Sequence, residues 1–162
     1  MQIQMRKEFK QMIINNQGRI RYIASRYSHD GEYDDLHQEI LLQLWRSFES
    51  FSGESKQETW VFKVALNTAC TFVRAAAKQK KIKQSPLHQS MQELQPAQES
   101  CQADILNLFM DGLSDTDASL LMMYLDGLSS DDSAKVLGIS SNAVRSRIKR
   151  IKNEFETNYI GD

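Results

Sequence analysis

Apolar residues recur every three or four positions along most of the chain, which is the spacing of one face of an α-helix. The strict alternation that a half-buried strand requires is not found. The stripes predict helices over residues 3–14, 17–27, 33–48, 59–81, 105–113 and 115–125, followed by two more helices near the C-terminus. Glycine and proline are scarce, so few positions interrupt these helices. We therefore predict an all-α fold.

Both prolines of the chain, Pro86 and Pro96, lie in a polar segment rich in Gln and Ser. Proline removes a backbone donor and clashes with the preceding turn, so a helix does not run through such a segment. We predict a flexible linker over residues 85–103. It divides the chain into two small helical domains, residues 1–84 and residues 104–162, and each must bury its own core.

The two C-terminal helices have the pattern of a helix-turn-helix. Ser129 is placed to cap the first of them, and Gly138 supplies the positive φ that favours a tight helix end. Asp131 and Asp132 stand in the first turn, where the helix dipole favours acidic groups. Ser140 can cap the second helix. Paired caps around a three-residue turn predict two short helices joined tightly.

The second of these helices carries an apolar stripe, formed by Val144, Ile148, Ile151 and Phe155. At 100° per residue the opposite side is basic and polar, which suits hydrogen bonding to DNA in a major groove. The candidate DNA-contacting residues are Ser141, Asn142, Arg145, Ser146, Lys149 and Arg150. We therefore predict DNA binding. An ordinary amphipathic helix with a solvated basic face is the alternative, but it does not account for the caps and the turn.

Charge is segregated along the chain, although the net charge is only −1. Residues 59–92 contain no acidic residue, residues 93–132 contain no basic residue, and residues 133–162 are basic overall. Such blocks suit two DNA-facing surfaces separated by an acidic one, while solvated faces or a disordered linker are the alternative. Because tethered opposite charges attract, we expect the domains to pack together in the free protein, with the linker or its acidic neighbours shielding basic residues 78–83 and 145–152.

The sequence lacks a phosphate-binding loop and a nucleophile elbow, so we expect no enzyme, no catalytic residue and no small-molecule substrate. Cys70 and Cys101 are too few for a disulfide framework or a zinc site. Asp34-x-x-His37 matches half of a carboxylate-bridged metal site, but the chain has no second copy, so we expect no metal and no cofactor. A signal peptide or a membrane-length apolar run is not found, and we expect a cytoplasmic protein without membrane insertion.

Two motif sets precede the helix-turn-helix in the chain. They are Asp34-Asp35-Leu36-His37-Gln38-Glu39 with Phe48-x-x-Phe51, and Thr59-Trp60-x-x-Lys63-x-Ala65-x-Asn67. In this order, the motifs and the helix-turn-helix resemble a bacterial RNA polymerase sigma factor. The division into two helical domains and a linker is similar to the extracytoplasmic-function (ECF) group of that family.

The resemblance implies a protein that binds core RNA polymerase, through its β and β′ subunits, and directs initiation at promoter DNA. Contact with the clamp helices of the β′ subunit falls to Asp35, Gln38 and Glu39. Recognition of the promoter −10 element is implied for Lys56, Trp60, Lys63, Asn67, Arg74 and Lys78. The helix-turn-helix is then the reader of the −35 element. An anti-sigma factor is a further candidate partner.

The sequence departs from the family pattern at Ala75, Ala76 and Ala77, where many relatives carry arginines. A sigma-like interaction protein without promoter activity is therefore one alternative. A helix-turn-helix regulator is another, but it would need a receiver or ligand-binding module that the helical first half does not offer. A linker of this length extends to about 60–70 Å. Two DNA elements that are two helical turns apart are separated by about 70 Å, so the linker together with the two domains can span them.

Overall fold

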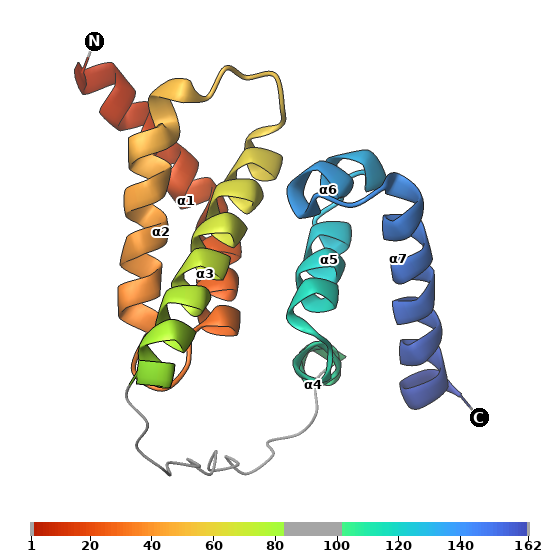
Figure 1. Cartoon of the computed structure of the whole chain (residues 1–162). Helices are drawn as coiled ribbons and strands as arrows, with labels where there is room; N and C mark the ends of the chain where they lie inside the picture. The colour runs from red at the N-terminus through yellow and green to blue at the C-terminus, as the bar shows by residue number, and fades with distance from the viewer. Residues whose placement is uncertain (1, 83–101, 162) are drawn as a thin grey trace.

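The computed structural model describes residues 2–82 and 102–161 of the 162-residue chain. Every regular element in these two ranges is helical, which confirms the all-α prediction (Figure 1). The helices are α1 (Gln2–Tyr27), α2 (Tyr33–Ser47), α3 (Gln57–Ile82), α4 (Gln102–Gly112), α5 (Asp115–Leu125), α6 (Ser130–Leu137) and α7 (Ser141–Phe155). Two short turns of helix follow α2 and α7, at Phe48–Ser50 and Glu156–Ile160. Most of the predicted linker lies outside the described residues.

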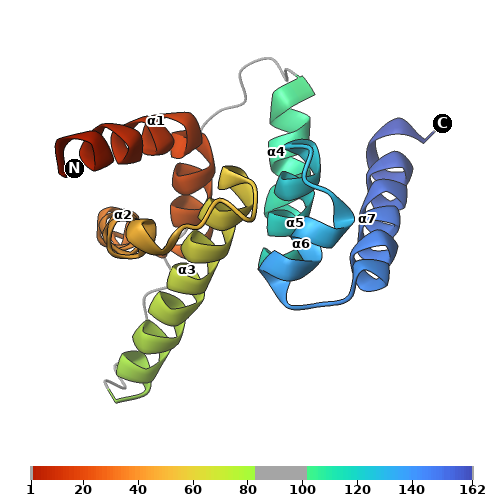
Figure 2. The same ribbon diagram turned by 90° about the horizontal axis from the view of Figure 1, so that it is seen from above.

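The N-terminal bundle consists of α1, α2 and α3, and its core is the apolar side of α2. Leu36, Ile40 and Leu44 recur every four residues and are completely buried. They pack in one cluster with apolar residues of α1 and α3, including Ile20 and Phe62. Seen from above, α1 runs across the bundle while α2 and α3 stand beside each other (Figure 2). The opposite side of α2 is thereby left free to carry polar groups.

The first two predicted helices form one continuous helix, so the prediction of a break near residues 15–16 was wrong. Asn and Gly favour turns when the chain is considered locally. Here the Asn16 side chain is buried, and its amide donates to the Met12 carbonyl at 2.9 Å. The Gln11 amide likewise donates to Asn15 at 2.9 Å. These bonds within one helical turn satisfy the polar groups without ending the helix.

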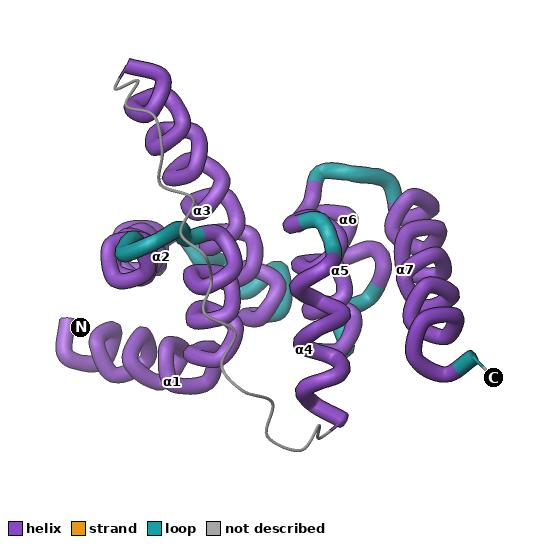
Figure 3. The backbone as a smooth tube through the Cα atoms, turned by 90° about the horizontal axis from the view of Figure 1, so that it is seen from below, coloured by secondary structure: helices purple, strands orange, loops and turns teal. Residues whose placement is uncertain are grey.

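The C-terminal bundle consists of α4 to α7. Phe109 and Met110 of α4 pack against Leu121 of α5 and Ile151 of α7 in one buried cluster. Beyond them, Phe109 meets Phe155 edge to face, with ring centroids 5.1 Å apart. Helix α5 therefore runs through the centre of this bundle, with α4, α6 and α7 around it (Figure 3).

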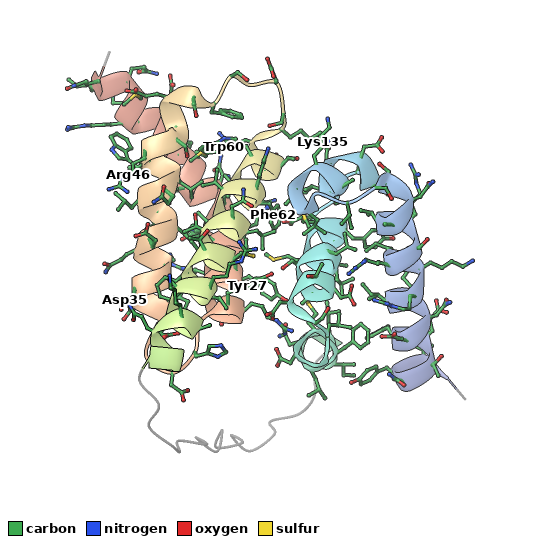
Figure 4. The ribbon with its side chains drawn as sticks, viewed as in Figure 1. Tyr27, Asp35, Arg46, Trp60, Phe62 and Lys135 are labelled. Carbon is green, nitrogen blue, oxygen red and sulfur yellow. The ribbon has the colours of Figure 1, made fainter. Side chains whose placement is uncertain are left out.

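The two bundles pack against each other, which confirms the expected domain contact. Helix α3 lies beside α6, and α1 contacts α5. Tyr27 and Phe62 lie on the side of the N-terminal bundle that faces the other bundle (Figure 4). The expected shielding of residues 145–152 is found only in part, because Asp117 bonds to Arg147 and Arg150 while α7 lies at the outer edge of the molecule and Arg145 and Lys149 are exposed (Figure 1). Lys78 is exposed as well, so its expected shielding was wrong. Shielding of residues 80–83 concerns side chains outside the described part.

We predict a pH dependence that arises from two tyrosines in this contact. Burial raises the pKa of Tyr22 and of Tyr27 above the ordinary value near 10.0, and the Ser119 hydrogen bond only partly offsets the effect at Tyr27. A raised pKa stabilises the fold below the ordinary value, and this contribution is lost as pH rises through the folded-state pKa.

Phenolate absorbance against pH should therefore show part of the tyrosine signal appearing at higher pH in the native protein than in denaturant. The free energy of unfolding should fall over the same alkaline range. Identical titration curves in the native and denatured protein would contradict burial of these two hydroxyls.

Candidate nucleic-acid and partner interfaces

The helix-turn-helix forms as its sequence predicts. Ser129 Oγ accepts from the Asp132 amide at 3.1 Å, and Ser140 Oγ accepts from the Ala143 amide at the same distance. Gly138 ends α6 with a φ of 69°, a conformation that glycine adopts without strain. All three predicted end signals are confirmed. They hold α6 and α7 in a tight pair with little freedom in the turn.

A side-chain bond also joins the starts of α6 and α7. Ser141 Oγ donates to the Asp131 carboxylate at 2.5 Å, and a terminal nitrogen of Arg145 lies 3.9 Å from the same oxygen. Ser141, one of the predicted DNA-contacting residues, is thus engaged inside the protein. Arg145 remains exposed, with its guanidinium also donating to Asn142 at 3.1 Å. The first turn of α7 therefore holds the Arg145 guanidinium in place while leaving it exposed to solvent.

The exposed face of α7 is the strongest candidate DNA interface. Its apolar residues Val144, Ile148 and Ile151 are buried toward the bundle. At 100° per residue, the exposed residues occupy one arc on the other side. They include Asn142, Arg145, Ser146 and Lys149. Two cations and two hydrogen-bonding side chains on one ridge suit contact with phosphates and base edges.

Arg150, the sixth predicted DNA-contacting residue, is exposed but also forms a hydrogen bond within the protein. A terminal nitrogen of its guanidinium donates to Asp117 at 2.5 Å, and Arg147 donates to the other carboxylate oxygen at 3.2 Å. The Asp117 side chain is 12% exposed, while that of Arg150 is 54% exposed. One carboxylate of α5 therefore holds two arginines of α7. This clamp was not predicted from the sequence, although an acidic residue in the first turn of a helix was its visible signal.

The acidic side of α2 is a second candidate interface. Asp35 and Gln38 are exposed, and Glu39 is half-buried and accepts from the Gln43 amide at 2.8 Å. Asp35 lies on the side of α2 away from the C-terminal bundle (Figure 4). The structure therefore brings the three predicted partner-binding residues onto one open helix side. Their negative charge suits a basic partner surface.

A polar stripe runs along α3 and forms the third candidate interface. Lys63, Asn67, Arg74 and Lys78 are all exposed, and their spacing of 4, 7 and 4 residues places them within about 60° of one another around the helix. These four predicted DNA-contacting residues thus share one face. Amide and cationic groups along 16 residues of helix can follow a nucleic-acid backbone.

Two further predicted residues lie at the start of α3. Lys56 is exposed in the loop before the helix. Trp60 is half-buried, with its ring centroid 5.1 Å from that of Phe51 and 6.5 Å from that of Phe48. Trp60 thus belongs in part to an aromatic cluster, which holds the loop against α3. A groove between α2 and α3 then connects the second and third interfaces, with Glu39 on one wall and Asn67 on the other.

The Asp34-x-x-His37 motif does not form a metal cluster. His37 is half-buried and stacks on Tyr33, with ring centroids 5.7 Å apart and planes 8° from parallel. Within residues 2–82 and 102–161, no group of three His, Cys, Asp or Glu side chains is arranged to hold a metal ion. Across the same two ranges, none of the helices has the length and apolar character needed to cross a membrane.

By its fold, this is a two-bundle helical protein whose second bundle holds a helix-turn-helix. The family model "Sigma-70 region 2" matches residues 12–79, and "Sigma-70, region 4" matches residues 103–154. The first range covers most of the N-terminal bundle, and the second covers most of the C-terminal bundle. The chain belongs to the sigma-70 family of RNA polymerase sigma factors, in its ECF group.

Individual relatives agree with this placement. The chain is 32% identical over 69 residues to the ECF RNA polymerase sigma-E factor of Escherichia coli (strain K12), which is 43% of this chain and 36% of that protein. It is 33% identical over 70 residues to the protein of the same name from Haemophilus influenzae, or 43% of this chain and 37% of that protein. The matched segment thus spans little more than a third of these relatives.

Two solved structures share the fold over nearly the whole chain. The sigma factor RpoE of Bartonella quintana, solved with the anti-sigma factor NepR, superimposes with a TM-score of 0.74 over 93% of this chain and 96% of that chain, at 23% identity. CnrH, solved with the cytosolic domain of CnrY, gives a TM-score of 0.60 over 94% and 87% of the two chains, at 18% identity.

We predict that Asp117→Asn destabilises the C-terminal bundle by about 1–2 kcal/mol, because one arginine loses its acceptor and the other keeps only an uncharged one, while both arginines stay partly solvated. Glu154→Gln is the matched control. It removes the other carboxylate near Arg150, which lies 3.8 Å away on the surface, and should change stability by less than about 0.5 kcal/mol. Denaturant unfolding measures both. Equal effects of the two substitutions would contradict a clamp at Asp117.

Proposed function

We propose that this protein is a bacterial RNA polymerase sigma factor that acts in the cytoplasm, binds core polymerase and directs initiation at promoters with −10 and −35 elements. The observation that carries the proposal is the pair of exposed polar and basic faces on α3 and α7. They lie in separate bundles that match region 2 and region 4 of the family. Two DNA-facing surfaces on separate units suit a promoter read in two parts.

We assign core-polymerase binding to the acidic side of α2. Asp35, Gln38 and Glu39 lie together on a helix side that is open to solvent, and α2 is anchored behind them by completely buried leucine and isoleucine residues. A rigid helix with an acidic ridge suits docking on a basic surface, as the resemblance assigns to the β′ clamp helices. The β subunit is a further contact in this assignment.

We assign the −10 element to the stripe on α3 and the loop before it. Lys63, Asn67, Arg74 and Lys78 supply phosphate and base contacts along one strand, while Lys56 and Trp60 stand at the end where the loop meets the helix. Ala75, Ala76 and Ala77 contribute no charge to this surface. Recognition of the −10 element therefore depends on fewer cations than in relatives that carry arginines there.

We assign the −35 element to α7. Arg145 and Lys149 stand at the centre of its exposed arc, with Asn142 and Ser146 beside them. Arg150 contributes at the edge of that arc while it stays bonded to Asp117. The clamp limits rotation of α7, so the exposed arc keeps a fixed orientation toward a groove.

An anti-sigma factor is a candidate regulatory partner. RpoE of Bartonella quintana was solved with the anti-sigma factor NepR, and CnrH with the cytosolic domain of CnrY. This chain shares their fold over more than nine-tenths of its length. A protein partner that covers the acidic side of α2 would prevent docking on polymerase.

We predict that the double variant Asp35→Lys, Glu39→Lys binds core polymerase about tenfold more weakly or worse, because like charges then face each other across the contact. Both side chains lie off the buried side of α2, so helical circular dichroism should not change. The variant Glu8→Lys, Glu156→Lys makes the same change of charge at exposed positions elsewhere and should bind normally. Undiminished binding by the α2 variant would refute the assignment.

We predict that Arg145→Ala and Lys149→Ala each weaken promoter recognition by the holoenzyme. A residue that bonds to a base should cost about 1–3 kcal/mol and relax specificity at one position, whereas a phosphate contact should cost affinity uniformly across sequences. Transcription from a promoter library with core polymerase distinguishes these outcomes. Lys135→Ala, at an exposed lysine of α6, is the control. Library profiles identical to the unsubstituted protein would show that α7 does not face DNA.

A further inference from the structure

One carboxylate joins the start of α6 to the start of α7. Asp131, in the first turn of α6, accepts a hydrogen bond at 2.5 Å from the hydroxyl of Ser141, the first residue of α7. A short bond between a hydroxyl and a carboxylate is of the strong, charge-assisted kind. Helix α6 and the start of α7 lie at the same end of the C-terminal bundle (Figure 1). The bond therefore fixes the Asp131 carboxylate beside the helix that carries the candidate DNA-contacting residues.

The same carboxylate stands beside Arg145. Nη2 of Arg145 lies 3.9 Å from the Asp131 oxygen to which Ser141 donates. Nη1 of the same guanidinium donates to the Asn142 side chain at 3.1 Å. Each terminal nitrogen thus has its own neighbour, and a long side chain with two neighbours loses much of its rotamer freedom. Arg145 is held in one conformation although 58% of its side chain is exposed.

These contacts contribute little to the stability of the fold. The side chain of Asp131 is 71% exposed, and exposed ion pairs lose most of their Coulomb energy to water and salt. The pair of α6 and α7 is already held by its two serine caps and by burial of Val144 and Ile148. The arrangement around Asp131 therefore matters for what Arg145 can bind.

Asp131 changes the balance between the two kinds of DNA contact that Arg145 can make. A guanidinium binds phosphate through its charge and base edges through the direction of its N–H groups. A carboxylate beside it offsets part of the charge and so weakens the attraction to phosphate. The donors remain available, because within the described part of the chain the Arg145 guanidinium uses one of its five N–H groups in a hydrogen bond. Base contacts are therefore favoured over phosphate contacts.

The start of α6 is closed to phosphate for a related reason. A helix N-terminus ordinarily attracts phosphate, because its first amides are unpaired and its dipole is positive there. In α6, Asp131 and Asp132 occupy the first turn, and Ser129 Oγ accepts from the Asp132 amide at 3.1 Å. Two negative charges and a filled cap leave phosphate no favourable place. DNA that lies against this corner is therefore bound through the exposed arc of α7.

Guanine is the base that fits a fixed guanidinium best. In the major groove guanine presents two acceptors, N7 and O6, which two N–H groups of one arginine can bind together. Adenine presents one acceptor and one donor, so the second N–H group would face another donor. A guanidinium with a fixed orientation therefore distinguishes guanine from adenine more sharply than one that rotates freely.

We propose that Asp131 is a positioning residue, which makes Arg145 read a guanine in the −35 element instead of binding a phosphate. The proposal rests on the assignment of this chain as a sigma factor. Asp131 acts through Arg145 and does not itself contact DNA. Specificity at one promoter position is thus set by a residue of α6, outside the helix that reads the groove.

Transcription by the holoenzyme from a promoter library with a randomised −35 element tests this proposal. Asp131→Asn keeps the shape of the side chain and an acceptor for Ser141 but removes the charge. Preference for guanine at one −35 position should fall about fivefold or more, while the other positions keep their preferences. Asp132→Asn removes an equal charge from the same helical turn, so any change in general DNA affinity is shared, and it should retain the guanine preference. Equal library profiles for the two variants would overturn the proposal.

A double variant shows whether Asp131 acts through Arg145. In an Arg145→Ala background, Asp131→Asn should cause no further change in base preference, because the group that it positions is gone. A further change as large as that in the unsubstituted background would refute action through Arg145. Helical circular dichroism should be the same for every variant, since Asp131 and Arg145 are both exposed.

The unsubstituted protein separates this proposal from the sigma assignment. If it supports no promoter-specific transcription with core polymerase, the sigma assignment fails, and the role of Asp131 fails with it. If it is specific but Asp131→Asn keeps the full guanine preference, only the positioning role is refuted. A −35 profile without any guanine preference that depends on Arg145 would refute that role as well.

Discussion

The rest of the structure depends on the burial of one side of α3. This helix packs against α1, α2 and α6, and Phe62, Ala65 and Ala69 on its buried side are completely covered. Because that side is fixed, Lys63, Asn67 and the basic residues beyond them must face solvent. The same packing therefore holds the N-terminal bundle together, aligns a polar stripe, and attaches the C-terminal bundle.

In the C-terminal bundle, α7 must also be held in one orientation, and it has fewer buried residues than α3 to do so. Helix α7 has a narrow apolar stripe, so side-chain bonds at its start and along its middle supplement apolar burial. Ser140 and Asp131 fix its start, and Asp117 holds two arginines in its middle. The result is a short helix with a defined exposed arc. Orientation of this arc is the property that groove recognition requires.

Local signals made much of this predictable from sequence. The caps and the glycine of the helix-turn-helix act within a few residues, so Ser129, Gly138 and Ser140 were assigned correctly. The unbroken α1 was missed because burial of Asn16 overrides a local preference for turns. Charge blocks predicted that the domains attract but misplaced the contact. Arg26 binds carbonyls at a helix end 84 residues away, and such partners become visible only in the folded chain.

The central claim is that two surfaces, on α3 and α7, read promoter DNA together once the protein is bound to polymerase. Footprinting of genomic DNA fragments, with the protein alone and with added core polymerase, tests this most directly. The account predicts protection only when polymerase is present, over two DNA segments about two helical turns apart. A single protected segment that the protein produces without polymerase would contradict it and would indicate an ordinary helix-turn-helix regulator.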